Sequence, residues 1–131
     1  GGDNDSKFNH HNVKCLKSLN TKQLRGFYNI ADVLALPTEF EGFGHVLLES
    51  LGCGTPIVGF DTPTNAISEI LKDDCFGHSS REVSIQSLIE LLLIANKNKA
   101  SNRSMIASRS LEVFTWGKWK EFFKQNKGEN V

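Results

Sequence analysis

The chain has 131 residues, of which 39% are hydrophobic and 23% charged, as is ordinary for one soluble domain that can bury a core. Its 15 basic and 15 acidic residues give a net charge of zero, which argues against a nucleic-acid-binding or membrane-adhering surface. No apolar run approaches the length of a transmembrane segment. Cys15, Cys53 and Cys75 lack the spacing of a disulfide framework or a zinc site, so we expect a reduced, cytoplasmic protein without a bound metal.

The N-terminal part is predicted to pass from an arm to a strand and then to a helix. Residues 1–11 are polar and are predicted to be loose, and residues 12–16 alternate enough to form a strand. Asn20 and Gln23 have the spacing of a capping box, which predicts the start of a helix. The apolar residues that follow fall on one helical face: Leu24, Phe27, Tyr28 and Ala31.

The centre of the chain is predicted to form two strands joined by a loop and a helix. Residues 32–36 are a short apolar run closed by a proline, which is typical of a buried parallel strand. Gly42 and Gly44 permit backbone angles and close approaches that side chains forbid. A helical pattern follows over 44–52, and a second strand is expected over 56–60.

The same alternation continues to the end of the chain. A short helix is predicted over 66–71 and a short strand over 75–78. Ser84 can cap a helix that runs to Ala95. Two more helices are expected after a polar break, at 101–113 and 116–125. Strands that alternate with helices indicate an α/β fold with a parallel sheet.

The loop-to-helix junction after the first central strand carries the residues best suited to a ligand. The first turn of the predicted helix has free N–H groups and the positive end of the helix dipole, which suit a phosphate. His45 and Glu49 lie four residues apart and share a helix face. A carboxylate accepts hydrogen bonds from sugar hydroxyls, so Glu41 and Glu49 beside such amides suggest a nucleotide sugar. In open α/β sheets such loops lie at the carboxyl ends of the strands, where ligands bind.

The glutamate loop and its flanks resemble the donor-binding signature of the retaining glycosyltransferases of GT-B architecture, family 4 type, also called glycosyl transferases group 1. Residues 29–38 look like the family's strand before the loop, and residues 68–71 look like its following helix. Phe114-Thr115-Trp116 looks like the aromatic start of its last helix. The resemblance covers roughly residues 12–125 and implies a Rossmann-like parallel sheet flanked by helices. Residues 1–131 would then form a partial C-terminal, donor-binding domain.

The resemblance also implies roles for individual residues. The residue matching Glu41 lies beside the donor sugar and is taken as catalytic, and the residue matching Glu49 binds the ribose hydroxyls of the nucleotide. The backbone that approaches the sugar and diphosphate matches Gly42, Phe43, Gly44 and His45. The alternative is that Glu41 is a solvated loop carboxylate and Glu49 a surface residue of a helix.

Two further residues remain open between binding and structure. Glu69 matches a family position near the nucleotide, and the alternative is a surface residue. Thr38 follows the strand and either donates to the ligand or only ends the sheet.

What the chain lacks shapes the functional prediction. The family's acceptor-binding N-terminal domain is absent, and the Arg and Lys that neutralise the diphosphate have no counterpart before residue 12. We therefore expect a fragment, split subunit or truncated paralogue, inactive alone, that takes a nucleotide sugar as substrate and needs the missing domain or a partner chain. No cofactor and no nucleic acid are expected. The expected location is the cytoplasm, with contact to the inner membrane surface through a partner left open. The alternative function is a non-catalytic module that binds a nucleotide sugar or a partner.

Overall fold

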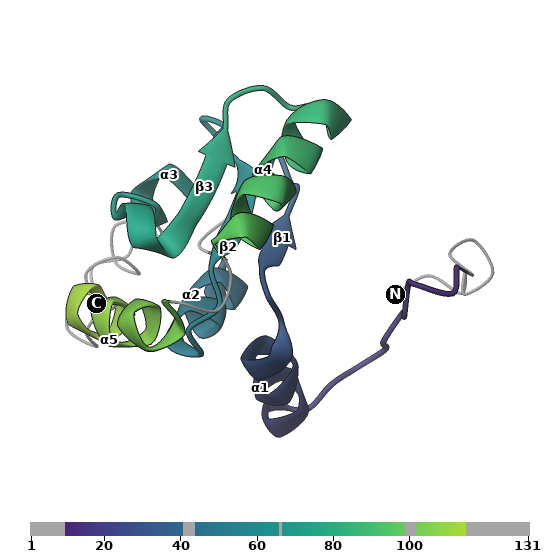
Figure 1. Ribbon diagram of the computed structural model, residues 1–131, viewed down its shortest axis with the longest axis vertical. Coiled ribbons are helices and arrows are strands. Elements are labelled where there is room, and N and C mark those ends of the chain that lie inside the picture. Colours follow the sequence, from purple (N-terminus) through teal and green to yellow (C-terminus); the bar gives the residue numbers. More distant parts are fainter. Residues whose placement is uncertain (1–9, 41–43, 66, 99–101, 115–131) are drawn as a thin grey trace, which may run out of the picture.

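The computed structural model describes residues 10–40, 44–65, 67–98 and 102–114. In this part of the chain three parallel strands form one sheet in the order β1–β2–β3 (Figure 1). The strands are β1 (Leu34–Leu36), β2 (Ile57–Phe60) and β3 (Gly77–Ser80). The helices are α1 (Thr21–Ile30), α2 (His45–Gly52), α3 (Ile67–Ile70), α4 (Ile85–Lys97) and α5 (Arg103–Val113), and a 3-10 turn, η1 (Asp74–Phe76), precedes β3.

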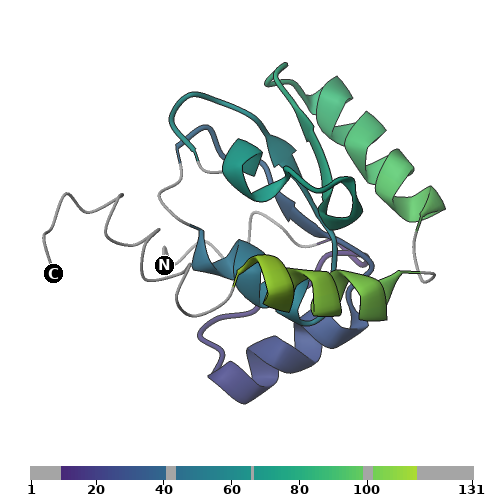
Figure 2. The same cartoon turned by 90° about the vertical axis from the view of Figure 1, so that its left-hand side faces the viewer.

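Helices cover the two faces of this sheet, which confirms the predicted α/β fold. Figure 2 shows α4 on one side of the strands and α2, α3 and α5 on the other. All four residues of the central strand β2 are buried. Because side chains alternate along a strand, Ile57 joins the larger core and Val58 the smaller core under α4. The larger core also contains Leu47, Leu48, Leu51, Ile67, Ile70, Phe76 and Ile106, and the smaller one Leu91 and Ala95.

Local sequence signals correctly located two helix starts. The Asn20 side chain accepts a hydrogen bond from the Gln23 N–H at 2.9 Å, and the Gln23 side chain accepts one from the Asn20 N–H at 3.0 Å. Ser84 caps α4 by accepting from the Ser87 N–H at 3.1 Å. These bonds satisfy N–H groups that have no partner within the helix, which is why both helices begin where the sequence indicates.

The strand predicted over 12–16 is wrong. This segment pairs with no strand among the described residues and forms an exposed arm that leads into α1 (Figure 1). Val13 and Leu16 are 52% and 42% exposed. A strand requires a neighbour for its backbone hydrogen bonds, and alternation alone does not supply one.

The last strand also differs from its prediction. The strand expected over 75–78 occupies Gly77–Ser80 instead. Asp73 accepts a hydrogen bond from the Cys75 N–H at 3.2 Å and starts the turn η1, so the chain straightens two residues later than expected. The helix predicted over 116–125 lies outside the described residues.

Candidate functional site

The N-terminus of α2 has the geometry expected for the start of a ligand-binding helix. Gly44 is buried and has a φ of 38°, a left-handed conformation that glycine adopts readily. Gly44, the N-cap residue, makes no side-chain capping bond. His45, the first helical residue, is exposed. The N-cap residue itself therefore does not cover the first turn of α2 or the positive end of its dipole.

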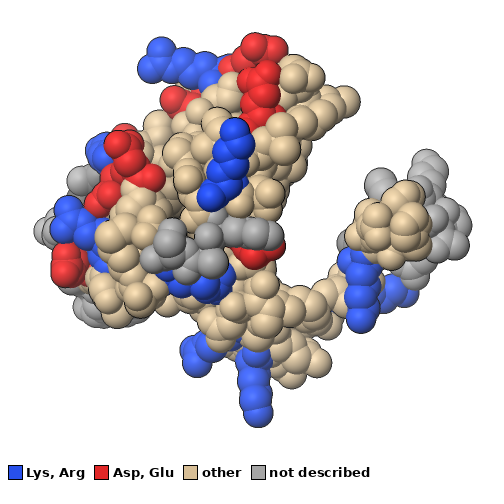
Figure 3. Space-filling model, in the orientation of Figure 1, with Lys and Arg blue, Asp and Glu red and all other residues tan. Residues whose placement is uncertain are grey.

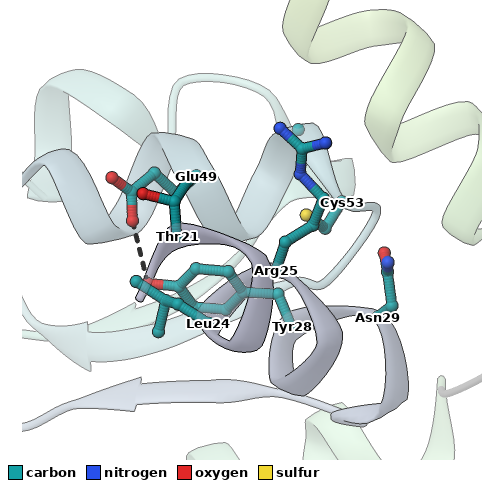
Figure 4. Close-up of a pocket in the computed structure, with 8 residues that line it drawn as sticks. Thr21, Leu24, Arg25, Tyr28, Asn29, Glu49 and Cys53 are labelled. Atoms are coloured by element: carbon teal, nitrogen blue, oxygen red, sulfur yellow. Dashed lines mark hydrogen bonds between the residues drawn. The ribbon is translucent and has the colours of Figure 1, made fainter. Parts of the chain in front are cut away.

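Glu49 lies farther along α2 and faces α1. Its Oε2 accepts a hydrogen bond from the Tyr28 hydroxyl at 3.2 Å (Figure 4). Tyr28 is only 7% exposed. Burial, followed by the negative charge of Glu49, raises the pKa of Tyr28 to about 12. The phenol is therefore protonated at neutral pH and serves as the donor in this bond.

A pocket of about 470 Å³ lies between α1 and α2 with Glu49 in its wall. Its lining residues are Thr21, Leu24, Arg25, Tyr28, Asn29, Glu49, Gly52 and Cys53 (Figure 4). The α1 side of this pocket is electropositive: the sequence from His10 to Ala31 contains two lysines before the helix, Lys22 and Arg25 within it, and no acidic residue. Figure 3 likewise shows basic side chains without acidic ones around α1, while both signs mix elsewhere on that face.

The carbonyl of Tyr28 is held by two residues distant in the sequence. The Thr55 hydroxyl and the Arg103 guanidinium both donate to it, the latter at 3.0 Å. Arg103 also donates to the carbonyls of Asn29 and Ala31, at 2.8 and 2.6 Å, and to the Thr55 hydroxyl at 3.0 Å. Arg103, at the start of α5, thus donates hydrogen bonds to the last carbonyls of α1. These carbonyls have no N–H partner within the helix itself.

A second set of contacts ties together the chain segments that follow β1 and β2. The Asn65 amide donates to the carbonyls of Thr38 and Phe60, at 3.2 and 2.7 Å. The hydroxyls of Thr62 and Thr64 both donate to the Glu39 carbonyl, at 2.6 Å each. These bonds anchor the backbone immediately before Glu41. The carbonyl of Thr38 thus helps to join the two loops. Donation from the Thr38 hydroxyl to a ligand stays a prediction.

Glu69 lies in a different place from Glu49. Its side chain is 58% exposed and pairs with Lys72 at 2.8 Å. It lines a pocket of about 610 Å³ beyond the carboxyl ends of β2 and β3, together with Asp61 and Arg81. The described residues do not bring Glu49 and Glu69 into one pocket, and a contact of Glu69 with a nucleotide stays a prediction.

The described residues therefore include only part of the predicted site. Glu41, Gly42 and Phe43 lie outside the described residues, so their predicted roles stay predictions. Sequence reasoning placed Tyr28 on the core face of its helix and did not identify it as the partner of Glu49. The available signal was its hydroxyl, because a buried tyrosine usually finds a hydrogen-bond partner.

Comparison with known proteins identifies the family. Residues 5–110 match the model of the family described as glycosyl transferases group 1. The chain belongs to this family. The glycosyl transferases group 1 resemblance seen in the glutamate loop and its flanks is thereby confirmed over most of the chain. No solved structure gives a significant match.

Individual relatives of this glycosyltransferase chain come from bacteria and an archaeon. It is 34% identical over 92 residues to a GDP-mannose-dependent alpha-(1-6)-phosphatidylinositol dimannoside mannosyltransferase of Mycobacterium tuberculosis, covering 70% of this chain and 23% of the relative. It is 36% identical over 67 residues to an uncharacterized glycosyltransferase of Methanocaldococcus jannaschii, covering 51% and 17%. A D-inositol 3-phosphate glycosyltransferase of Corynebacterium jeikeium is 42% identical over 50 residues, covering 38% and 12%. The chain thus spans less than a quarter of these relatives.

The described residues contain neither a membrane-spanning helix nor a metal-binding cluster. None of their helices has the length and apolar character needed to cross a membrane. In the same part of the chain, no three histidine, cysteine, aspartate or glutamate side chains are grouped in a way that could hold a metal ion.

Proposed function

We propose that this chain is the donor-binding part of a GT-B glycosyltransferase that transfers a sugar from a nucleotide sugar to an acceptor such as a glycan or a lipid-linked saccharide. The observation that carries the proposal is the position of Glu49. Its side chain is exposed, is oriented by a protein donor, and stands in the wall of the pocket between α1 and α2. The mannosyltransferase relative, named for its dependence on GDP-mannose, supports the same class of donor.

In this proposal Glu49 accepts hydrogen bonds from the ribose. An ionised carboxylate has about four lone-pair sites on two oxygens. Tyr28 uses one site on Oε2, which leaves Oε1 and the rest of Oε2 for the adjacent 2′- and 3′-hydroxyls. The nucleoside then occupies the pocket between α1 and α2, where Leu24 offers apolar surface to a base.

The diphosphate lies toward the N-terminus of α2. The first turn of α2 and the positive end of its dipole attract a phosphate, with about 0.3–1 kcal/mol from the helix dipole at an exposed site. Arg25 in the pocket wall and the basic character of α1 add long-range attraction. Such donors also stabilise the diphosphate as it leaves, which is the contribution of this chain to the chemical step. Glu41 positions the donor sugar in this proposal, and the acceptor contacts come from another domain or a partner chain. The proposed reaction uses no cofactor or metal, and we propose the cytoplasm as the location of the protein.

The experiment is to measure binding of UDP and GDP to the chain by ligand-observed NMR or calorimetry. We expect dissociation constants between about millimolar and high micromolar, because few contacts offset the cost of association. Glu49→Ala should weaken binding about tenfold or more, since charge-assisted hydrogen bonds to the ribose are lost. Glu90→Ala is the matched control, because Glu90 is an exposed helical glutamate that bonds only to Gln86 among the described residues. Tight binding that survives Glu49→Ala would contradict the proposed site.

A non-catalytic module is the second candidate, and the open edge of the sheet favours it. β1 pairs on one side only among the described residues, so the unit is suited to completion by another protein segment. An assay of sugar transfer by the chain joined to, or mixed with, an acceptor-binding domain separates the two candidates. Transfer that depends on Glu41 supports the enzyme, and nucleotide binding without transfer supports the module.

A further inference from the structure

We propose that Tyr28 is a positioning residue for donor recognition: its hydroxyl fixes the carboxylate of Glu49 in the orientation that receives the ribose. This inference rests on the proposed function of Glu49. It assigns to α1, which lies outside the glutamate motif, a part in the selection of ribonucleotides.

The first support is the contact itself. A glutamate on a helix surface ordinarily samples several rotamers, and ordering such a side chain on binding weakens affinity. Here the Tyr28 hydroxyl donates to Oε2 of Glu49 at 3.2 Å, across the interface between α1 and α2. Figure 4 shows the tyrosine ring along the pocket wall with its hydroxyl directed at the carboxylate. The carboxylate is thus ordered before the nucleotide arrives.

The second support is that Tyr28 is itself fixed. Its side chain is 7% exposed, and its carbonyl accepts hydrogen bonds from Thr55 and Arg103. Thr55 is completely buried and follows the C-terminal end of α2, the helix that carries Glu49. The same turn therefore fixes the end of α1, which carries Tyr28, relative to α2, which carries Glu49. The tyrosine is thus held by the fold and can hold the glutamate in turn.

The third support is the form of the ligand. A ribose presents two neighbouring hydroxyls, and a carboxylate receives both only when its plane has the correct rotation. A 2′-deoxyribose presents only one of these hydroxyls, so its binding depends less on how the carboxylate is rotated. Loss of the Tyr28 hydroxyl should therefore reduce the preference for ribonucleotides, whereas a general loosening of the fold would weaken both ligands alike.

The test compares UDP with 2′-deoxy-UDP on the wild-type chain, Tyr28→Phe and Glu49→Gln. Tyr28→Phe keeps the ring and the backbone contacts and removes only the donor. We expect the wild type to prefer UDP and Tyr28→Phe to lower this preference about threefold to tenfold, the range expected for one hydrogen bond. In the Glu49→Gln background Tyr28→Phe should have no further effect on the preference, because the tyrosine acts through the carboxylate.

A second measurement does not depend on any ligand. Three-bond couplings about χ1 and χ2 of Glu49, measured by NMR on the free chain, should indicate one rotamer in the wild type and averaging in Tyr28→Phe. An unchanged preference or an unchanged rotamer in Tyr28→Phe would overturn the role of Tyr28. If Glu49→Ala leaves nucleotide binding intact, the proposed function fails instead, and the couplings still decide whether Tyr28 orders Glu49.

Discussion

Asp73 shows how a single carboxylate can organise the end of this sheet. It accepts a hydrogen bond from the Cys75 N–H and pairs with the Arg109 Nε of α5 at 2.7 Å. The Arg109 hydrogen bond, together with those from Cys75, lowers the pKa of Asp73 to about 2 from an ordinary value of 3.8. The charged form is thus favoured in the folded state, and the residue links η1 to α5.

A pH dependence of stability follows from this pKa. A carboxyl whose pKa is lower in the folded state stabilises the fold above its unfolded pKa, and this stabilisation is lost as the pH falls toward the folded pKa. The free energy of unfolding should therefore fall between pH 4 and pH 2, and more steeply in the wild type than in Asp73→Asn. Asparagine is an equally good helix cap, so this variant removes mainly the ion pair.

Denaturant titrations at several pH values test this expectation. Glu112→Gln is the control, because Glu112 also pairs with Arg109, at 3.0 Å, but is 66% exposed. Equal slopes for the wild type and Asp73→Asn would show that Asp73 makes no contribution of this kind.

At the scale of elements, α5 approaches the turn between α2 and β2 so closely that only glycine fits there. Gly54 has a φ of 79°, and a Cβ at this position would lie 2.4 Å from the Arg103 carbonyl oxygen. At Gly52, two residues earlier at the end of α2, no atom from elsewhere in the described residues lies within 4 Å of the corresponding position. Gly52 is therefore a control for the general effect of replacing a glycine, whereas Gly54 combines a left-handed backbone with a close approach of α5.

Gly54→Ala should destabilise the fold by more than about 1 kcal/mol, because the left-handed backbone and the carbonyl contact both oppose a side chain. Gly52→Ala should be neutral or stabilising by up to about 1 kcal/mol, since alanine favours a helix. Urea unfolding of both variants, followed by circular dichroism, measures the difference. A Gly54→Ala variant as stable as Gly52→Ala would contradict the close packing of α5 on this turn.

The elements also show which features a single sequence predicts. Asn20 and Ser84 located helix starts because a cap and its helix are adjacent in the chain. The segment 12–16 was assigned to a strand because its alternation is local, whereas the missing pairing partner is not. The bond from Tyr28 to Glu49 depends on how two helices face each other, and no local pattern encodes that orientation. The bonds from Arg103 to the end of α1 likewise join residues that are distant in the chain.

At the scale of the whole molecule, the centre of the sheet is better shielded from solvent than its edges. The central strand β2 is buried and paired on both sides, while β1 is an edge strand in the described part of the chain. The Leu34 N–H bonds to the Pro56 carbonyl on the β2 side, so the next N–H, that of Ala35, points to the open side. A further strand, from the same protein or from a partner chain, would pair at this edge.

Amide hydrogen exchange should reflect this asymmetry. We expect Val58 to exchange slowly, at the rate of global opening. Ala35 should exchange far faster, because its N–H faces the edge of the sheet that no strand among the described residues covers. NMR-detected exchange at two protein concentrations measures both amides. If Ala35 exchanges slowly, and more slowly at the higher protein concentration, a second copy of the chain pairs with this edge instead.

The contacts of Arg103 have a consequence for the order in which the protein acquires its ligand site. Its guanidinium reaches carbonyls and a hydroxyl that lie between 48 and 75 residues earlier in the chain. During synthesis α1, α2 and Glu49 leave the ribosome well before Arg103, and contacts between distant residues form late. A nascent chain that ends before α5 contains Glu49 but lacks the Arg103 hydrogen bonds that hold the backbone of Tyr28. The proposed nucleotide site therefore depends on α5 as well as on the glutamate loop and forms only after α5 has packed against the end of α1.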